Sequence, residues 1–186
     1  MNTKYLVYAA LMTAIIAVMG LVPAIPLPFI PVPIVLQNVG VFLAGIILGR
    51  KYGVLSVIVF LLLVMAGAPL LSGGRGGFGV FLGPSAGYLG MYVIVAFLIG
   101  WARDHHYDKL NFGRTLAIIV IYGVILLDAV GGIVMALIIH MPIDKALLLS
   151  LTFIPGDLIK AVIASLIAVA LYRNPVTARI MRQLSA

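Results

Sequence analysis

An acid and an amine stand three residues apart near the C-terminal end of the chain, in an almost wholly apolar setting. Asp157 and Lys160 lie in the run IPGDLIK, directly after a Pro-Gly pair that disrupts helices. Residues three apart lie on one face of a helix, so both side chains can reach the same object. A carboxylate only accepts hydrogen bonds and an ammonium only donates them, so the pair matches a neutral ligand with N–H beside C=O, such as a cyclic urea. The alternative is a structural ion pair, in which the two charges neutralise one another.

The composition identifies the class of protein. The chain of 186 residues is 64% hydrophobic and only 9% charged, with a mean hydropathy of +1.26. Soluble domains carry about 25% charged residues, so this chain has too little polar surface for water and is an integral membrane protein. Ionisable groups at membrane depth are costly and by default indicate functional sites. The absence of cysteine excludes disulfides and thiolate metal sites.

Six apolar segments divide the chain, which we interpret as an all-α integral membrane protein formed by a single domain, residues 1–186. The segments are Tyr5–Val22, Ile34–Leu48, Tyr52–Ala66, Gly83–Trp101, Thr115–His140 and Lys145–Tyr172. A span needs about 20 apolar residues, so the second and third segments are short, and the sixth is too long for one straight helix. The Pro-Gly pair gives the sixth a natural break. We predict a bundle of six transmembrane helices with long, irregular outer loops.

The positive charges give the orientation. With the N-terminus inside, nine of the twelve Lys and Arg residues are cytoplasmic: Lys4, Arg50, Lys51, Arg103, Lys109, Arg114, Arg173, Arg179 and Arg182. Only Arg75, Lys145 and Lys160 fall outside. This asymmetry follows the positive-inside rule, places both termini in the cytoplasm and leaves the inner loops basic and otherwise ordinary. It also argues against nucleic-acid binding, since the net charge of +7 is spread over the ends of apolar runs.

The unusual backbone residues lie in two outer loops, on the same side as the acid–amine pair. Residues 22–33 hold five of the ten prolines, which force an extended backbone; this loop is either a stiff connector or a lid over an apolar ligand. Residues 67–90 hold nine of the twenty glycines, which let the backbone approach a ligand or let helices pack closely. The spacing Gly74-x-Gly76-x-x-Gly79 lacks the strand and the acidic residue of a dinucleotide site. Together the loops point to an outward-facing binding site.

Two charged residues have more than one interpretation. Arg75 is the one charge of the glycine loop and is either the partner of an anion or a solvated side chain. Asp128 lies in the middle of the fifth segment, where it serves as structural polar glue by bonding groups such as Gln37 or Asn38, or else has a functional role.

The first segment carries a face of small residues, Ala10-x-x-x-Ala14. Small residues let another helix come close, either within this chain or in a partner subunit, and the spacing alone does not choose. The adjacent His105 and His106 have no third ligand at metal spacing, so we expect no metal site.

Together these motifs resemble the biotin-specific S-component (BioY) family of energy-coupling factor transporters, and the resemblance covers nearly the whole chain. The runs that carry it are Pro31–Gln37, Gly73–Gly77 continuing to Gly83–Leu89, and Pro155–Lys160. Any one run is weak, but three in this order on six spans are specific. The family often reads Gly-Pro-Thr-Gly-Gly-Tyr where this chain has Gly-Pro-Ser-Ala-Gly-Tyr; Ser keeps the hydroxyl and Ala stays small.

The resemblance implies a multi-pass protein of the bacterial plasma membrane that captures biotin from outside and has no catalytic residues and no cofactor. Its implied partners are membrane lipid, a transmembrane coupling subunit and two cytoplasmic ATPase subunits. Ala10 and Ala14 match the family's docking face, and Asp157 and Lys160 match the residues that hold the biotin head group. The chain has no nucleotide-binding motif of its own, which agrees with ATP hydrolysis on other subunits.

The predicted binding site combines the acid–amine pair with the two outer loops. Its residues are Asp157, Lys160, Ser72, Gly73, Gly74, Arg75, Phe29, Gln37, Phe78 and Tyr88. The aromatic side chains are expected to lie against the fused rings of the ligand, and the ureido group to meet the ion pair and Ser72. Arg75 faces either the ligand carboxylate or solvent.

Two functions from other classes compete with this interpretation. An intramembrane enzyme would use Asp128 or Asp157 as a base, but the sequence offers no Ser/His or Cys/His arrangement and no metal triad. A self-sufficient facilitator for a small vitamin or amine would use Asp128 as a proton carrier and need no ATPase.

Overall fold

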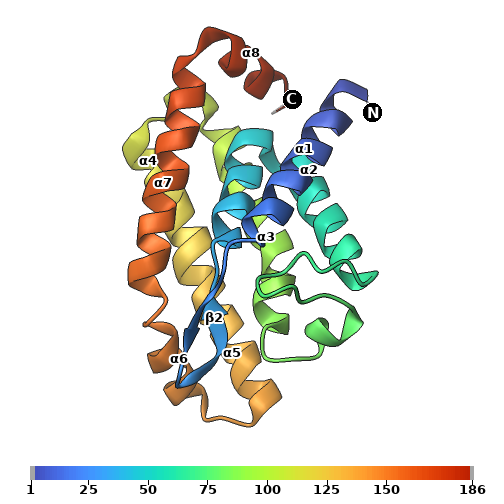
Figure 1. The fold of residues 1–186 in the computed structure, drawn as a ribbon. Helices are drawn as coiled ribbons and strands as arrows, with labels where there is room; N and C mark the ends of the chain where they lie inside the picture. The colour runs from blue at the N-terminus through green and yellow to red at the C-terminus, as the bar shows by residue number, and fades with distance from the viewer. Residues whose placement is uncertain (1–2, 185–186) are drawn as a thin grey trace.

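The computed structural model describes residues 3–184, which form a helical protein with one small β-hairpin (Figure 1). In chain order the elements are α1 Thr3–Met19, β1 Ile25–Leu27, β2 Ile30–Ile34, α2 Gln37–Met65, η1 Phe78–Phe81, α3 Ala86–His105, η2 Tyr107–Lys109, α4 Phe112–Ile119, η3 Val120–Leu126, α5 Leu127–Ile139, α6 Ile143–Ser150, α7 Ile154–Arg173 and α8 Pro175–Leu184.

Within the described residues, four helical stretches are long and apolar enough to cross a membrane. They are Gln37–Met65, Ala86–His105, Phe112–Ile139 and Ile154–Arg173, and the apolar α1 is shorter, with 17 residues. Their lengths fit a hydrocarbon core that needs about 20 residues for each span. The prediction of a helical membrane protein is therefore confirmed.

Helix α2 is a hairpin of two arms. Gly49 has φ 76° and ψ −176°, a conformation outside the helical region that residues with a side chain rarely adopt. A Cβ built on Gly53 would lie 2.4 Å from the carbonyl oxygen of Ala44. Nine residues of straight helix would separate these positions by about 13 Å, so the chain reverses at Gly49 and the arms pack together. The predicted second and third segments are these two arms.

The proline-rich loop is partly ordered as a β-ribbon. Strands β1 and β2 pair antiparallel, with Ile25 opposite Ile34 and Leu27 opposite Ile30. Ile30 and Val32 are buried, and prolines alternate with them along β2. A proline has no N–H to donate, but each strand of a two-stranded ribbon needs donors only on the edge that faces its partner, so the ribbon tolerates these prolines. The extended backbone was expected, but an irregular loop was the wrong description, because alternating apolar residues let the two halves pair.

The sixth predicted segment is broken close to the predicted place. Helix α6 ends at Ser150 and α7 begins at Ile154, so Pro155 lies in the first turn of α7. There the missing N–H costs no intrahelical hydrogen bond. The break therefore precedes the Pro-Gly pair, and the amide of Asp157 already bonds the carbonyl of Phe153 at 2.9 Å.

The fifth predicted segment is continuous from α4 to α5, with a π-helical stretch, η3, between them. The two described ends of the chain lie at one end of the molecule, and the β-hairpin and α6 lie at the other (Figure 1). Helix α2 packs against α1, α3 and α7 in the centre of the bundle.

Candidate functional site

A cavity opens near the β-hairpin end of the bundle, where several elements meet. Its walls are Val32, Pro33, Ile34, Val35, Gln37, Asn38, Leu71, Ser72, Arg75, Ser85, Tyr88, Leu89, Tyr92, Asp128, Phe153, Asp157 and Lys160. The volume of this space, its open mouth included, is about 540 Å³. A mostly apolar cleft with a few converging polar groups is typical of a small-molecule site.

The acid–amine pair forms the polar end of this cavity. Lys160 Nζ donates to Asp157 Oδ1 at 2.5 Å, and both side chains are buried, with 8% and 3% of their surfaces exposed. The i,i+3 spacing in α7 therefore places both groups on one face, as predicted. Replacing a buried ion pair with apolar side chains often leaves stability unchanged or improves it, so stability alone does not explain its presence.

Two polar residues of other helices hold Asp157 in place. Asn38, at the start of α2, donates from Nδ2 to Asp157 Oδ1 at 3.4 Å. The hydroxyl of Tyr92 in α3 donates to Asn38 Oδ1 at 2.7 Å. Because Tyr92 occupies the amide oxygen, the amide nitrogen is directed to the carboxylate. Three helices thus fix the orientation of one carboxyl group.

The glycine loop places Ser72 and Arg75 in the cavity wall. Leu71 and Arg75 form an isolated antiparallel bridge, and Gly73 and Gly74 between them have φ values of 80° and 69°. Such a tight turn requires glycine. Arg75 Nε donates to the carbonyl oxygen of Ser72 at 3.2 Å, which orders the guanidinium at the cavity.

Aromatic side chains form another wall. The rings of Tyr88 and Phe153 meet edge to face, with centroids 6.0 Å apart. The Tyr88 hydroxyl lies 3.5 Å from Ser150 Oγ, a residue of α6. This contact links α3 to the end of α6, directly before the break that precedes α7, and so anchors the aromatic wall of the cavity.

The structure brings together six of the ten predicted site residues. Those in the cavity wall are Asp157, Lys160, Ser72, Arg75, Gln37 and Tyr88. The other four, Gly73, Gly74, Phe29 and Phe78, lie outside the wall, and the two phenylalanine residues are 55% and 59% exposed. Gln37 uses its amide nitrogen on the carbonyl oxygens of Ile16 and Leu70, at 3.3 and 2.8 Å. Its donor group therefore joins the glycine loop to α1.

Several wall residues were missed by the sequence argument. Asn38 is a polar residue in an apolar segment, a signal that was used only to find a partner for Asp128. Tyr92 lies one helical turn after Tyr88, and this spacing was available too. Phe153 gave no signal, because its place follows from the turn between α6 and α7.

Asp128 also lies in the cavity wall and is 5% exposed. Its predicted hydrogen-bond partners were Gln37 and Asn38, but these side chains bond backbone carbonyls, Asp157 and Tyr92 instead. Its carboxyl group lies beside that of Asp157.

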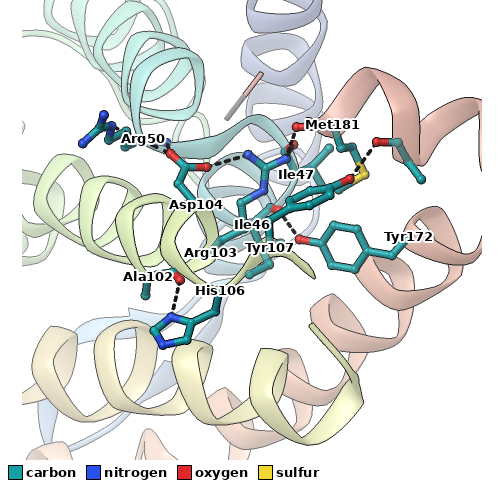
Figure 2. Close-up of polar contacts among 11 residues, drawn as sticks. Ile46, Ile47, Arg50, Ala102, Arg103, Asp104, His106, Tyr107, Tyr172 and Met181 are labelled. Carbon is teal, nitrogen blue, oxygen red and sulfur yellow. Dashed lines mark hydrogen bonds and ion pairs between the residues drawn. The ribbon is translucent and has the colours of Figure 1, made fainter. Parts of the chain in front are cut away.

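A second polar cluster occupies the end of the bundle where the termini lie. Arg103, placed by the sequence among ordinary cytoplasmic cations, is fully buried. It pairs with Asp104 at 2.7 Å, donates to the carbonyl oxygens of Ile47 (3.3 Å) and Met181, and lies 4.9 Å from the centre of the Tyr107 ring (Figure 2). The cluster therefore joins α2 and α3 to α8.

Two tyrosines complete this cluster. The Tyr107 hydroxyl donates to the carbonyl oxygen of Ala178 at 2.7 Å, and the Tyr172 hydroxyl to that of Ile46 at 2.6 Å. Burial raises the pKa of Tyr107, although the guanidinium of Arg103 lowers it in part. The hydroxyl therefore stays protonated and donates at neutral pH. These contacts hold one end of the bundle together.

The small-residue face of α1 points outward. Ala10 and Ala14 are exposed, while Ala9, Met12 and Ile16 on the opposite face are buried. Packing within this chain does not use the two small residues, so they are open to lipid or to another subunit. Among residues 3–184, no three His, Cys, Asp or Glu side chains gather as a metal site would need.

Known proteins match this chain over most of its length. A family model described as the BioY family matches residues 1–175. The biotin transporter BioY of Lactococcus lactis subsp. cremoris (strain MG1363) is 45% identical over 168 residues, 89% of each chain. The probable biotin transporter BioY of Bacillus subtilis (strain 168) is 46% identical over 164 residues, 88% of each chain. A crystal structure of the S-component for biotin from an ECF-type ABC transporter superposes with a TM-score of 0.89, at 43% identity and 92% coverage of both chains. The resemblance inferred from the motifs is confirmed.

Proposed function

The chain belongs to the BioY family, and we propose that it is the membrane-embedded subunit that captures biotin from outside the cell and delivers it inward with ATP-driven partner subunits. It is a transporter component and no enzyme, since its relatives are named as transporters. The same names, together with the S-component structure, do not favour a self-sufficient proton-coupled facilitator.

The observation that carries the proposal is the buried Asp157–Lys160 pair in the wall of a mostly apolar cavity. Biotin presents a ureido group, with N–H on either side of C=O. An ammonium carries three donors, and Lys160 uses one of them on Asp157, so the ureido oxygen can accept another. The N–H groups can donate to the carboxylate. Ser72 supports the same proposal, because its buried hydroxyl lines the cavity without a hydrogen-bond partner among the described residues.

We propose further that the fused rings lie against Tyr88 and that Arg75 pairs with the valerate carboxylate. Arg75 is in the wall and its backbone turn is fixed, which supports an ordered guanidinium at the mouth. Phe29 and Phe78 are exposed and lie outside the cavity wall. They remain proposed contacts of the ligand, and Gly73 and Gly74 remain proposed contacts through their backbone.

The proposed topology has six spans in one membrane domain, residues 1–186, within the bacterial plasma membrane. The spans are α1, the two arms of α2, α3, the stretch from α4 to α5, and α7 with α6 as its short lead. An even number of spans agrees with both described ends lying at one end of the molecule (Figure 1). The excess of cations at that end supports cytoplasmic termini.

The proposed partners are a transmembrane coupling subunit and two cytoplasmic ATPase subunits, with lipid around the rest. The exposed Ala10 and Ala14 support docking through α1, because small residues let a partner helix approach closely. Conformational change during transport would be driven by the partners, whose differential affinity for two states of this subunit shifts the equilibrium.

Equilibrium binding of biotin to the purified, detergent-solubilised chain tests the proposal. The wild type should bind, and both Asp157→Asn and Lys160→Ala should lose most of the affinity, since each removes one side of the ureido recognition. Asp144→Asn and Lys145→Ala repeat these substitutions at exposed positions of α6 and should bind as the wild type does. Absence of binding by a folded wild type would reject biotin as the ligand.

A further inference from the structure

Asp128 has a buried oxygen atom without a partner. The residue is 5% exposed, it lines the cavity, and its Oδ2 accepts no hydrogen bond from any described residue. Leaving a buried acceptor unsatisfied destabilises the folded protein, and more so when the group is charged. An apolar residue at this position would avoid that cost, so the carboxyl group points to a partner that comes from outside the chain.

The neighbouring Asp157 cannot meet both N–H groups of a cyclic urea without help. Its Oδ1 already accepts from Lys160 at 2.5 Å and from Asn38 at 3.4 Å. The carboxyl group of Asp128 also contacts Asp157, so at most Oδ2 is left for the ligand. A ureido group has two N–H donors that point in different directions, so its second donor needs a second acceptor. The carboxyl group of Asp128 stands beside that of Asp157 in the same wall.

The backbone before Asp128 is unusual in a way that supports a functional role. The π-helical stretch η3 covers Val120–Leu126, and Asp128 lies in the first turn of α5 that follows it. Such stretches are rare and are frequently found at functional sites. A π-helical turn contains more residues than an α-helical turn and so rotates all following side chains about the helix axis. The stretch η3 therefore contributes to the orientation that places Asp128 in the cavity wall.

We propose that Asp128 is the second acceptor of the ligand's ureido group, with Asp157 and Asp128 each taking one N–H and Lys160 donating to the oxygen between them. This inference rests on the proposed function and goes beyond the acid–amine pair. Two carboxylates side by side repel one another, and a ligand that places an N–H on each relieves that repulsion. The site then prefers ligands with two N–H donors over ligands with one.

The test is a binding cycle with two variants and three ligands. The ligands are biotin and two isosteric analogues in which one or the other ureido N–H is replaced by oxygen, giving cyclic carbamates. Asp128→Asn should lower the affinity for biotin roughly 10- to 100-fold, the effect of one charge-assisted hydrogen bond. It should lower the affinity for one carbamate equally and leave the affinity for the other unchanged, because that ligand lacks the N–H that Asp128 accepts.

Asp144→Asn is the matched control and should change none of the three affinities. An equal loss for all three ligands, or no loss for biotin, would overturn the inference while leaving biotin as the ligand. Absence of biotin binding by the folded wild type would overturn both the inference and the proposed function. If Asp128→Asn does not fold, Asp128→Ser carries the same measurement.

Discussion

The buried ion pair of α7 can be dissected into its contribution to stability and its contribution to binding. The perturbations are Lys160→Met, Asp157→Asn and the double variant with both changes. Each single variant leaves one charge of the pair without its partner: a carboxylate that keeps Asn38 as its amide donor, or an ammonium that faces only the carboxyl group of Asp128. The double variant removes both charges and keeps the volume of the side chains nearly unchanged.

The expected change in the free energy of unfolding differs between the single and the double variants. Removing one partner of a buried pair costs about 3–5 kcal/mol, whereas replacing both is often neutral or stabilising. For a chain of this length 1 kcal/mol corresponds to roughly 2–4 °C. Each single variant should therefore lower the apparent Tm by roughly 6–20 °C, and the double variant should recover most of that loss. Lys145→Met, on exposed α6, should leave Tm unchanged.

The assay combines thermal unfolding in detergent with equilibrium binding of biotin to the same samples. Stability should return in the double variant, but biotin binding should not, because the groups that meet the ureido oxygen and one N–H are gone. A double variant that binds like the wild type would refute the assignment of the pair to ligand recognition. A double variant as unstable as the singles would refute the argument from buried charge.

Two further predictions concern parts of the molecule away from the cavity. Arg103→Met should lower the free energy of unfolding by about 3–5 kcal/mol and leave biotin affinity unchanged, because the buried guanidinium joins α2, α3 and α8 at the end far from the cavity. Arg50→Met is the control, at a side chain that is 53% exposed and 3.9 Å from Asp104, and it should cost less than about 1 kcal/mol. Similar unfolding curves for the two variants would contradict this difference. Ala10→Leu should leave biotin binding intact and lower ATP-dependent uptake in membranes that contain the partner subunits. Ala170→Leu, at an exposed alanine of α7, should change neither binding nor uptake. Loss of biotin binding in Ala10→Leu would contradict the assignment of α1 as the docking face.

The sequence was sufficient for those parts of the fold that composition and local chemistry decide. Apolar runs of membrane length and proline at the start of α7 act within a few residues, so their consequences could be predicted. The β-ribbon of residues 25–34 could not, because its strands depend on pairing between two halves and on burial of Ile30 and Val32. The burial of Arg103 was hidden for the same reason, since its partners come from α2 and α8, far away in the chain.

The residues of the candidate site also fall into those placed by local sequence and those placed by contacts between distant segments. Asp157 and Lys160 share a helix, and their spacing alone placed them together. Asn38, Tyr92 and Asp128 belong to three other helices, and only the assembled bundle brings Asn38 and Asp128 to the carboxyl group of Asp157 and Tyr92 to Asn38. Their types gave a signal, since each is a polar group inside an apolar segment, but the direction in which each points depends on tertiary packing. For Asp128 it depends also on the π-helical stretch before it.

The two polar clusters differ in how completely their groups are bonded, and this difference supports the proposal that the cavity binds the ligand. At the end with the termini, the buried side chains of Arg103, Tyr107 and Tyr172 bond fixed backbone carbonyls, and one nitrogen of Arg103 is left over. In the cavity wall, Ser72 and Asp128 each present a buried oxygen without a partner among the described residues. Each such group costs about 1–3 kcal/mol, which a ligand returns as binding energy when it supplies the missing donor. The unbonded oxygens of Ser72 and Asp128 thus lower the stability of the empty protein, and they lie in the wall where a ureido ligand can supply the missing donors.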